Sequence, residues 1–329
     1  MGQTASVLSH LLFGFVPEQL WADFPPIKAD LTGRTYLITG SNTGLGLAAA
    51  VHLARLNPAR LILAVRDLSK GAKAKEHVLA QTNYAGTIDV WELDMSSFES
   101  VKRFADLANS SLTRLDGALI NAGMGPPPSW EVTVDGWERV LQVNAIATGL
   151  LCVLVLPLLQ ATIKQSQEPP HLTITGSESP WIAKFPEQRA TNILEALNDP
   201  KCSLKDRYAV SKTFDQYIGR VIAKLPQAEG LIVNYVNPGL CLSDIGRNSK
   251  PPEGFARKLY WTSEKGAINL VYAAVKPTPS GAFIGCCDLR EPPPWTTTEK
   301  GLLLERKVWD EMVEVWKSVS PDVGKILRV

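Results

Sequence analysis

The sequence predicts an α/β protein built on one doubly wound parallel sheet of about seven strands. Short apolar runs, each typical of a buried strand, alternate along the chain with longer segments that favour helices. A glycine-rich turn joins the first strand to the first helix. The chain has 329 residues, 45% of them hydrophobic, which is enough for one large domain with a sizeable core.

The first strand and the turn after it are the segment around which the other elements are arranged. A strand is predicted at 36–38, and the sequence LAAAVHLARL after the turn strongly favours a helix. Glycines let a ligand approach the backbone, and the N–H groups at a helix N-terminus attract negative charge. The turn is therefore predicted to bind an anionic ligand, the alternative being an ordinary tight surface turn. Its residues, with the glycine spacing G-x-x-x-G-x-G, are Gly40, Ser41, Asn42, Thr43, Gly44, Leu45 and Gly46.

The remaining elements follow in order. Further strands are predicted at 61–65, 88–93, 118–120, 171–175, 232–236 and 282–284. One helix is predicted at 70–80 with Ser69 as its N-cap, and the next runs from a cap at Ser96 or Ser97 to about 109. Later helices are predicted at 137–163, 205–224, 267–274 and 298–318. The first of these is expected to kink or end near Pro157.

The domain organisation is predicted to be simple, with no internal repeat. Residues 1–32 form an N-terminal arm with a short helix, and 33–329 form a single catalytic domain. The arm lies across the domain or, alternatively, covers one end of the substrate pocket. Residues 180–206 are expected to be an insertion beside the substrate, and 240–262 a substrate loop.

Several polar or glycine-containing features fall where the predicted strands end. Parallel sheets of this class bind ligands at the carboxyl ends of their strands, where the strand order reverses. Because all of these features meet at one edge, a site of nucleotide size is predicted there. They are the glycine turn, Arg66, Asp94, Asn121, 175–177 and 237–239.

A second chemical signal lies on the helix predicted at 205–224. Tyr208 and Lys212 are four residues apart, so their side chains share one face of that helix. A nearby ammonium stabilises a phenolate, which lets a tyrosine exchange a proton with a carbonyl oxygen or an alcohol. Ser177, just past the fifth strand, could hold the same oxygen. Ser179 is also available for that role, although an ordinary loop hydroxyl is favoured for it.

The end of the second strand addresses cofactor choice. An arginine at this corner can pair with the 2′-phosphate of NADP, whereas an acidic residue would hydrogen-bond the ribose of NAD. Arg66 occupies the corner, so NADP(H) is predicted. If the strand ended one residue later, Asp67 would point inward and favour NAD.

Composition and charge argue against other classes of protein. With 34 basic and 33 acidic residues, the net charge of +1 gives no electrostatic case for nucleic-acid binding. Five cysteines without a CxxC motif favour free thiols, and no metal site is expected. The apolar stretch at 145–163 contains Pro157 and is interpreted as a buried helix, so no transmembrane segment is predicted. A cytoplasmic protein is expected, although Gly2 begins a sequence that matches an N-myristoylation pattern.

The ordered set of motifs resembles the classical short-chain dehydrogenases/reductases. The motifs are TGSNTGLG, NAG at 121–123, Asn144, the serine in TGSES, YAVSK and NPG at 237–239. The resemblance extends from about 32 to at least 243. The sequences SNTGLG, LNDPKCSLKDRYAVSK and VWDEMVEVW are similar to the retinol-dehydrogenase-like and fungal branches of this family, which has a Rossmann fold.

The resemblance implies roles for the matching residues. Tyr208 is the implied acid/base, Lys212 binds the nicotinamide ribose, Ser177 orients the carbonyl, and Asn144 holds a water in the proton relay. Further cofactor contacts are implied for Asp94, Met95, Asn121, Ala122, Gly123, Pro238, Gly239, Leu240 and Ser243. The separation of Ser177 and Tyr208, 208 − 177 = 31 residues, is longer than in the family pattern and reflects the insertion.

The sequence thus predicts an NADP(H)-dependent oxidoreductase that interconverts a ketone or aldehyde with an alcohol. A bulky hydrophobic substrate, in a fungal natural-product pathway, is favoured because the expected pocket residues are apolar. These are Trp181, Phe185, Leu240, Leu242, Phe255, Tyr260 and Trp261, although each could equally pack in the core or in an interface. The alternatives are a retinoid- or steroid-type alcohol dehydrogenase, and a bifunctional or non-redox protein such as a cyclase or nucleotide sensor. By resemblance, a homo-oligomer that pairs through the helices of Asn144 and Tyr208 is expected.

Overall fold

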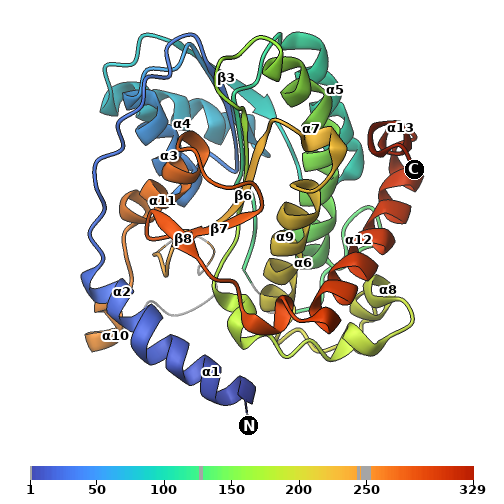
Figure 1. Ribbon diagram of the computed structural model, residues 1–329. Coiled ribbons are helices and arrows are strands. Elements are labelled where there is room, and N and C mark those ends of the chain that lie inside the picture. Colours follow the sequence, from blue (N-terminus) through green and yellow to red (C-terminus); the bar gives the residue numbers. More distant parts are fainter. Residues whose placement is uncertain (1, 126–128, 243–244, 246–252) are drawn as a thin grey trace.

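In the computed structural model, the strands within the described residues form a single eight-stranded sheet in the order β3-β2-β1-β4-β5-β6-β7-β8 (Figure 1). The structure describes residues 2–125, 129–242, 245 and 253–329. The first seven strands are parallel, and β8 pairs antiparallel with β7. Their bounds are β1 Thr35–Thr39, β2 Arg60–Val65, β3 Thr87–Glu92, β4 Gly117–Ile120, β5 His171–Thr175, β6 Ile232–Asn237, β7 Ala282–Gly285 and β8 Asp288–Arg290. The strand order reverses between β1 and β4, so the doubly wound α/β prediction is confirmed.

Helices cover both faces of the sheet and divide the core into two apolar clusters. One face carries α3 (Gly44–Arg55), α4 (Leu68–Gln81) and α11 (Ser263–Val275). The other carries α5 (Phe98–Ser111), α7 (Ala147–Ile163) and α9 (Arg207–Ile222). The amphipathic α12 (Glu299–Val319) and the short α13 (Asp322–Leu327) pack outside this second layer (Figure 1).

The second layer is held together by a tryptophan from the C-terminal helix. Trp316 is fully buried and donates a hydrogen bond from Nε1 to the carbonyl oxygen of Ile146 at 2.7 Å. Gly149 on α7 leaves room for this indole, since a Cβ there would collide with it. α12 therefore lies on α7 and α9, the helices through which the resemblance implied that subunits pair.

The long apolar helix contains a π-helical turn ahead of its longest part. It consists of α6 (Arg139–Leu141), a π-helical turn at Gln142–Ile146 and α7, which continues past Pro157. The helix therefore does not end at Pro157, and the π-helical turn around Asn144 was not predicted. This helix is the one in the described chain that is long and apolar enough to cross a membrane, but 78% of its most apolar window is buried inside the protein.

Two other local predictions are corrected by the structure. Asp67, not Ser69, is the N-cap of α4, because its carboxylate accepts hydrogen bonds from the backbone N–H groups of Ser69 and Lys70. The strand β8 was not predicted, since its hairpin turn is formed by Cys286 and Cys287, both with positive φ (52° and 57°). Turns of this kind usually carry glycine or asparagine, so the cysteines concealed the hairpin.

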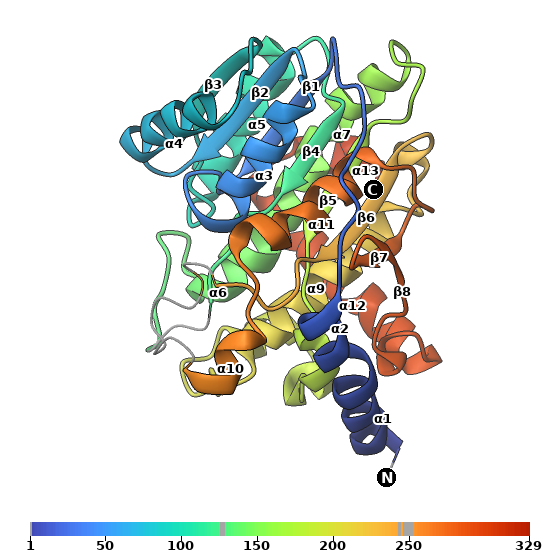
Figure 2. The ribbon, with the colours of Figure 1, turned by 90° about the vertical axis from the view of Figure 1, so that its left-hand side faces the viewer.

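Residues 2–21 of the N-terminal arm are helical and lie at one end of the molecule, whereas 22–32 contain no helix or strand (Figure 2). The helical part consists of α1 (Gly2–His10), a π-helical turn at Leu11–Phe15 and α2 (Val16–Trp21). Gln19 on α2 is buried, and its side-chain oxygen accepts a hydrogen bond from the Leu240 N–H at 2.9 Å. The carbonyl oxygen of Gln19 accepts another from Trp261 Nε1 at 2.7 Å. The arm is thus attached to the segment that follows β6.

The segment predicted as an insertion contains two short 3₁₀ helices, Ser179–Ile182 and Pro186–Arg189, followed by α8 (Ile193–Leu197). The Glu311 carboxylate on α12 accepts hydrogen bonds from the backbone N–H groups of Ile193 and Leu194. Most of the insertion therefore folds onto the C-terminal helix, and only its first residues stay near the edge of the sheet. In the 240–262 segment, the structure describes α10 (Gly254–Lys258).

Candidate active site

The glycine turn lies at the carboxyl end of β1, next to the point where the strand order reverses. Gly40 and Gly44 have φ values of 65° and 56°, which favour glycine. A Cβ on Gly46 would collide with the Gly40 carbonyl oxygen and lie 2.6 Å from the Asn121 Nδ2. The N-terminus of α3 therefore approaches the ends of β1 and β4 closely, as a backbone anion site requires.

The end of β4 is attached to the end of β1 by a buried threonine. Thr39 Oγ1 accepts hydrogen bonds from the backbone N–H groups of Asn121 (2.9 Å) and Ala122 (2.8 Å). The Asn121 side chain donates in turn to the Thr39 carbonyl oxygen at 3.0 Å. The predicted residues Asn121 and Ala122 thus lie beside the glycine turn. Sequence reasoning missed Thr39, whose signal is a polar residue at the end of an apolar strand.

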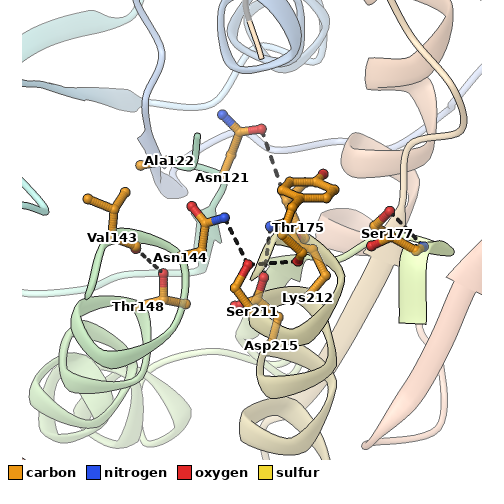
Figure 3. Close-up of polar contacts among 12 residues, drawn as sticks. Asn121, Ala122, Val143, Asn144, Thr148, Thr175, Ser177, Ser211, Lys212 and Asp215 are labelled. Atoms are coloured by element: carbon orange, nitrogen blue, oxygen red, sulfur yellow. Dashed lines mark hydrogen bonds and ion pairs between the residues drawn. The ribbon is translucent and has the colours of Figure 1, made fainter. Parts of the chain in front are cut away.

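Tyr208 and Lys212 lie on the same side of α9, as their spacing predicted. The Lys212 ammonium lies 6.0 Å from the centre of the Tyr208 ring. It donates hydrogen bonds to the carbonyl oxygen of Thr175 at the end of β5 (2.8 Å) and to Asp215 Oδ2 (2.7 Å). Through Thr175, whose hydroxyl donates to Asn121 Oδ1 at 3.5 Å, the lysine is connected to Asn121, which lies beside the glycine turn (Figure 3).

The buried charges of Lys212 and Asp215 change each other's protonation. Burial disfavours the ammonium, but the negative charge of Asp215 outweighs this effect and raises the pKa of Lys212. Burial raises the pKa of Asp215 to about 6, although Lys212 acts in the opposite direction. Sequence reasoning missed Asp215; its signal is an acidic residue one helical turn after Lys212.

Asn144 lies in the π-helical turn and is connected to α9. Its Nδ2 donates hydrogen bonds to Ser211 Oγ (3.0 Å) and to the Met124 carbonyl oxygen (2.9 Å), while its Oδ1 accepts from the Met124 N–H (2.8 Å). Ser211 Oγ then donates to the Tyr208 carbonyl oxygen at 2.8 Å. A Cβ on Gly123 would lie 3.4 Å from Asn144 Oδ1 and 3.8 Å from Lys212 Nζ. The structure thus brings Asn144, Gly123, Tyr208 and Lys212 together, and π-helical turns often occur at such sites.

Ser177 follows β5 and lies to one side of the Lys212 group (Figure 3). Its Oγ accepts a hydrogen bond from the Ser179 N–H at 3.0 Å, which fixes the turn but leaves its hydroxyl proton for another acceptor. Ser179 Oγ is buried and has no hydrogen-bond partner among the described residues.

The residues predicted near the adenosine end differ in what their side chains do. Arg66 is exposed, immediately after β2. Asp67 accepts hydrogen bonds from Ser69 and Lys70 as the cap of α4, so its carboxylate is already engaged. Asp94 Oδ1 likewise accepts from the Ser96 N–H (2.9 Å) and Ser96 Oγ (2.6 Å).

Beyond β6, Pro238 is buried and Gly239 has a φ of 81°. The Leu240 N–H is bound by Gln19, whereas Ser243 lies outside the described residues. Met95, on the adenosine side, is a buried core residue at 5% exposure.

Two of the apolar residues predicted to surround the substrate are buried inside the protein. Phe185 is buried in the core against Phe214, with ring centres 5.6 Å apart. Trp261 is 4% exposed and packs against Phe24 of the N-terminal segment. These two predictions are wrong as pocket positions, because packing of the insertion and of the arm buries the rings. The side chain of Phe255 lies outside the described part of the chain.

Comparison with known proteins identifies the family. A family model described as short chain dehydrogenase matches residues 34–167. The short chain dehydrogenase/reductase dmxR8 of Cryptosporiopsis sp. is 35% identical over 322 residues, which cover 94% of this chain and 98% of that protein. The chain belongs to the short-chain dehydrogenase/reductase family.

Two further relatives agree with this assignment. The short-chain dehydrogenase anuD of Penicillium roqueforti is 34% identical over 337 residues, covering 98% of this chain and 87% of the relative. Among solved structures, a short chain dehydrogenase from Escherichia coli CFT073 complexed with NADPH is 25% identical with a TM-score of 0.59, covering 79% of this chain and 99% of that chain. The predicted family, its fungal branch and its Rossmann fold are confirmed.

The described residues fit the nicotinamide dinucleotide on which this family depends. Ser41 Oγ, within the glycine turn, is buried without a hydrogen-bond partner among the described residues. The turn has no space for a Cβ at Gly40 or at Gly46. At Gly40, the Cβ would lie 2.9 Å from the Ala122 Cα. Within the described chain, Lys212 directs two of its three N–H donors to Thr175 and Asp215. An unpaired hydroxyl, close backbone approach and a buried ammonium form a suitable surface for phosphate and ribose groups.

Proposed function

We propose that this protein is an NADP(H)-dependent oxidoreductase that interconverts a ketone or aldehyde with an alcohol on a bulky hydrophobic substrate. The observation that carries the proposal is the position of the Lys212 ammonium. It lies 6.0 Å from the Tyr208 ring and is hydrogen-bonded to Thr175 at the edge of the sheet that carries the glycine turn. A nucleotide sensor would not require an acid/base pair at this position.

The mechanism divides the reaction between the cofactor and the protein. When bound, the nicotinamide supplies or accepts the hydride. Tyr208 donates a proton to the carbonyl oxygen in reduction and removes one from the alcohol in oxidation. Ser177 holds the same oxygen by a hydrogen bond. Lys212 binds the ribose and stabilises the phenolate, and Asn144 fixes the helix of Tyr208 through Ser211 and holds the water that renews its proton.

The preference for NADP(H) rests on the corner after β2. Asp67 is engaged as the cap of α4, so Arg66 is the charged residue available to a ligand there. An arginine at this point can form a bidentate pair with a 2′-phosphate. The Escherichia coli relative, which was solved with NADPH, supports this preference.

The substrate class rests on apolar side chains that stay near the substrate end of the site. Trp181 and Leu240 lie after β5 and β6, and Leu242 and Tyr260 follow in the next segment. The fungal origin of the relatives dmxR8 and anuD supports a role in a natural-product pathway. Residues 33–329 would then act as one catalytic domain with 1–32 as its arm. Pairing of subunits would need a surface other than α7 and α9, which α12 covers.

A panel of carbonyl substrates with NADPH, followed by product identification, tests the proposal. Wild-type protein should oxidise NADPH in the presence of apolar ketones or aldehydes. Tyr208→Phe should reduce turnover by at least about a thousand-fold while NADPH binding stays nearly unchanged, because the variant removes only the transferable proton. Normal turnover in Tyr208→Phe would contradict the mechanism.

A further inference from the structure

Asp215 is a buried carboxylate next to Lys212 for which the proposed mechanism has no role. It lies one turn after Lys212 on α9, and its Oδ2 is 2.7 Å from the ammonium (Figure 3). The side chains are 1% and 5% exposed, respectively. The pair is therefore removed from water at the point where the site requires a cation.

The carboxylate is poorly satisfied by hydrogen bonds. Its second oxygen, Oδ1, is buried and has no hydrogen-bond partner among the described residues. A buried ion pair repays its desolvation cost only when further hydrogen bonds satisfy the remaining lone pairs, which is not the case for Oδ1 within the described residues. Holding Lys212 in place does not require a charge, because the neutral carbonyl oxygen of Thr175 already accepts a hydrogen bond from it at 2.8 Å. The charge of Asp215 therefore calls for an electrostatic explanation.

The relevant charges near the phenol are few. Lys212 lies 6.0 Å from the Tyr208 ring, and an isolated cation at that distance favours the phenolate. A carboxylate 2.7 Å from that cation cancels much of its field at the phenol. Cys152 on α7, the other titratable group in the described chain that faces Asp215, is a neutral thiol because burial and the charge of Asp215 raise its pKa.

We propose that Asp215 weakens the effect of Lys212 on the Tyr208 phenol, so that the phenol loses its proton less readily than it would beside an unpaired lysine, which favours carbonyl reduction. This inference rests on the proposed function. In reduction, the phenol O–H bond breaks and its proton goes to the carbonyl oxygen. The carbonyl carbon receives the hydride of the reduced cofactor, which is thereby oxidised. A phenol that stays protonated to higher pH extends the range in which this step is fast.

The test compares Asp215→Asn, which removes the charge but keeps the shape, with Asp215→Glu, which keeps the charge. If Tyr208 is the acid/base, kcat/KM for oxidation by the wild-type protein should rise with pH and kcat/KM for reduction should fall. In Asp215→Asn, both midpoints should move to lower pH by about one unit, because the ammonium then acts on the phenol without a counter-charge. Asp215→Glu should keep the wild-type midpoints.

A second measurement does not depend on turnover. The ultraviolet absorbance of phenolate in cofactor-free protein, taken as the difference from the matching variant that also carries Tyr208→Phe, reports ionisation of this side chain. It should show the same shift to lower pH in Asp215→Asn. If wild-type protein turns over no carbonyl compound or alcohol, the proposed function fails, while this titration still tests the effect of Asp215.

Three results would overturn the inference. The first is an unchanged midpoint in Asp215→Asn. The second is a midpoint that moves to higher pH, as expected if the unpaired lysine loses its own proton. The third is loss of the fold in both Asp215→Asn and Asp215→Ser while Asp215→Glu stays folded, which would assign Asp215 a structural role.

Discussion

His10 on the N-terminal helix contacts Glu178, the residue that follows Ser177. The distance between Nε2 and Oε2 is 3.2 Å, and the imidazole ring stacks on Trp181 with 3.8 Å between ring centres. The other Glu178 oxygen, Oε1, accepts a hydrogen bond from the Asn237 side chain at 3.0 Å. One carboxylate therefore joins the N-terminal helix to the segments that follow β5 and β6, on the substrate side of the site.

His10→Ala should weaken substrate binding. Loss of both the stack and the contact to Glu178 frees the loop of Ser177, so KM should rise about five-fold, which corresponds to about 1 kcal/mol. NADPH affinity should stay unchanged, because the contacts of His10 lie away from the glycine turn. Steady-state kinetics with the best substrate of the panel provide the measurement. Leu8→Ala, at an exposed position of the same helix, is the matched control. An equal rise of KM in both variants would show that the contacts of His10 with Glu178 and Trp181 do not hold the loop of Ser177.

Arg66→Asp should change the cofactor preference. The substitution replaces a partner of the 2′-phosphate with a charge that repels it, so kcat/KM for NADPH relative to NADH should fall about ten- to a hundred-fold. Lys73→Asp makes the same change in charge at an exposed position on α4. If the two variants lower the NADPH/NADH ratio equally, long-range charge and not a specific contact decides the preference.

Trp316→Ala should strongly destabilise the protein. The indole is fully buried between α12 and α7, packs edge to face against Trp309 with ring centres 5.2 Å apart, and donates a hydrogen bond to Ile146. Its removal should lower the free energy of unfolding by about 3–5 kcal/mol, as measured by urea denaturation. Leu303→Ala on the same helix, where the side chain is 60% exposed, should change it by less than about 0.5 kcal/mol.

The same variant also tests how α12 relates to assembly. Because α12 covers the helices that the resemblance assigned to subunit pairing, Trp316→Ala should not release subunits from an oligomer. Sedimentation at several protein concentrations gives the answer. A concentration-dependent change of mass in the variant but not in the wild type would show that α12 contributes to a subunit interface.

Acid should destabilise the fold through His171. Burial lowers the pKa of this side chain to about 4, and its Nδ1 lies 3.0 Å from the carbonyl oxygen of Ala273, with Arg34 and Glu168 also acting on it. The unfolded chain binds a proton near pH 6.5 and the folded chain only near 4, so this contribution to stability is present above 6.5 and is lost as the pH falls toward 4. The loss should reach about 3 kcal/mol.

Unfolding by urea at a series of pH values measures the acid effect. His171→Asn keeps a polar side chain for Ala273 but cannot take up the proton, so its stability should fall less steeply between pH 6.5 and 4. Parallel curves for wild type and variant would show that other groups, such as the surface carboxylates, cause the acid loss.

Local patterns in the sequence determined the parallel α/β layout, the glycine turn and the shared face of Tyr208 and Lys212. Each of these features depends on an apolar run or on the spacing of residues within one helix, strand or turn, and the local sequence sets both. The position of Asn121 at a strand end also predicted it as a site residue, and the family motifs added Asn144; the structure brings Asn144 close to Lys212.

Tertiary structure alone decided how distant segments complete the site. Asp215 becomes significant because burial places it against Lys212, and His10 and Gln19 because the arm reaches loops more than 160 residues away. Phe185 and Trp261 have the composition of a pocket but are buried by packing of the insertion and of the arm. No local pattern reveals such contacts, because they depend on which surfaces remain to be covered once the sheet has formed.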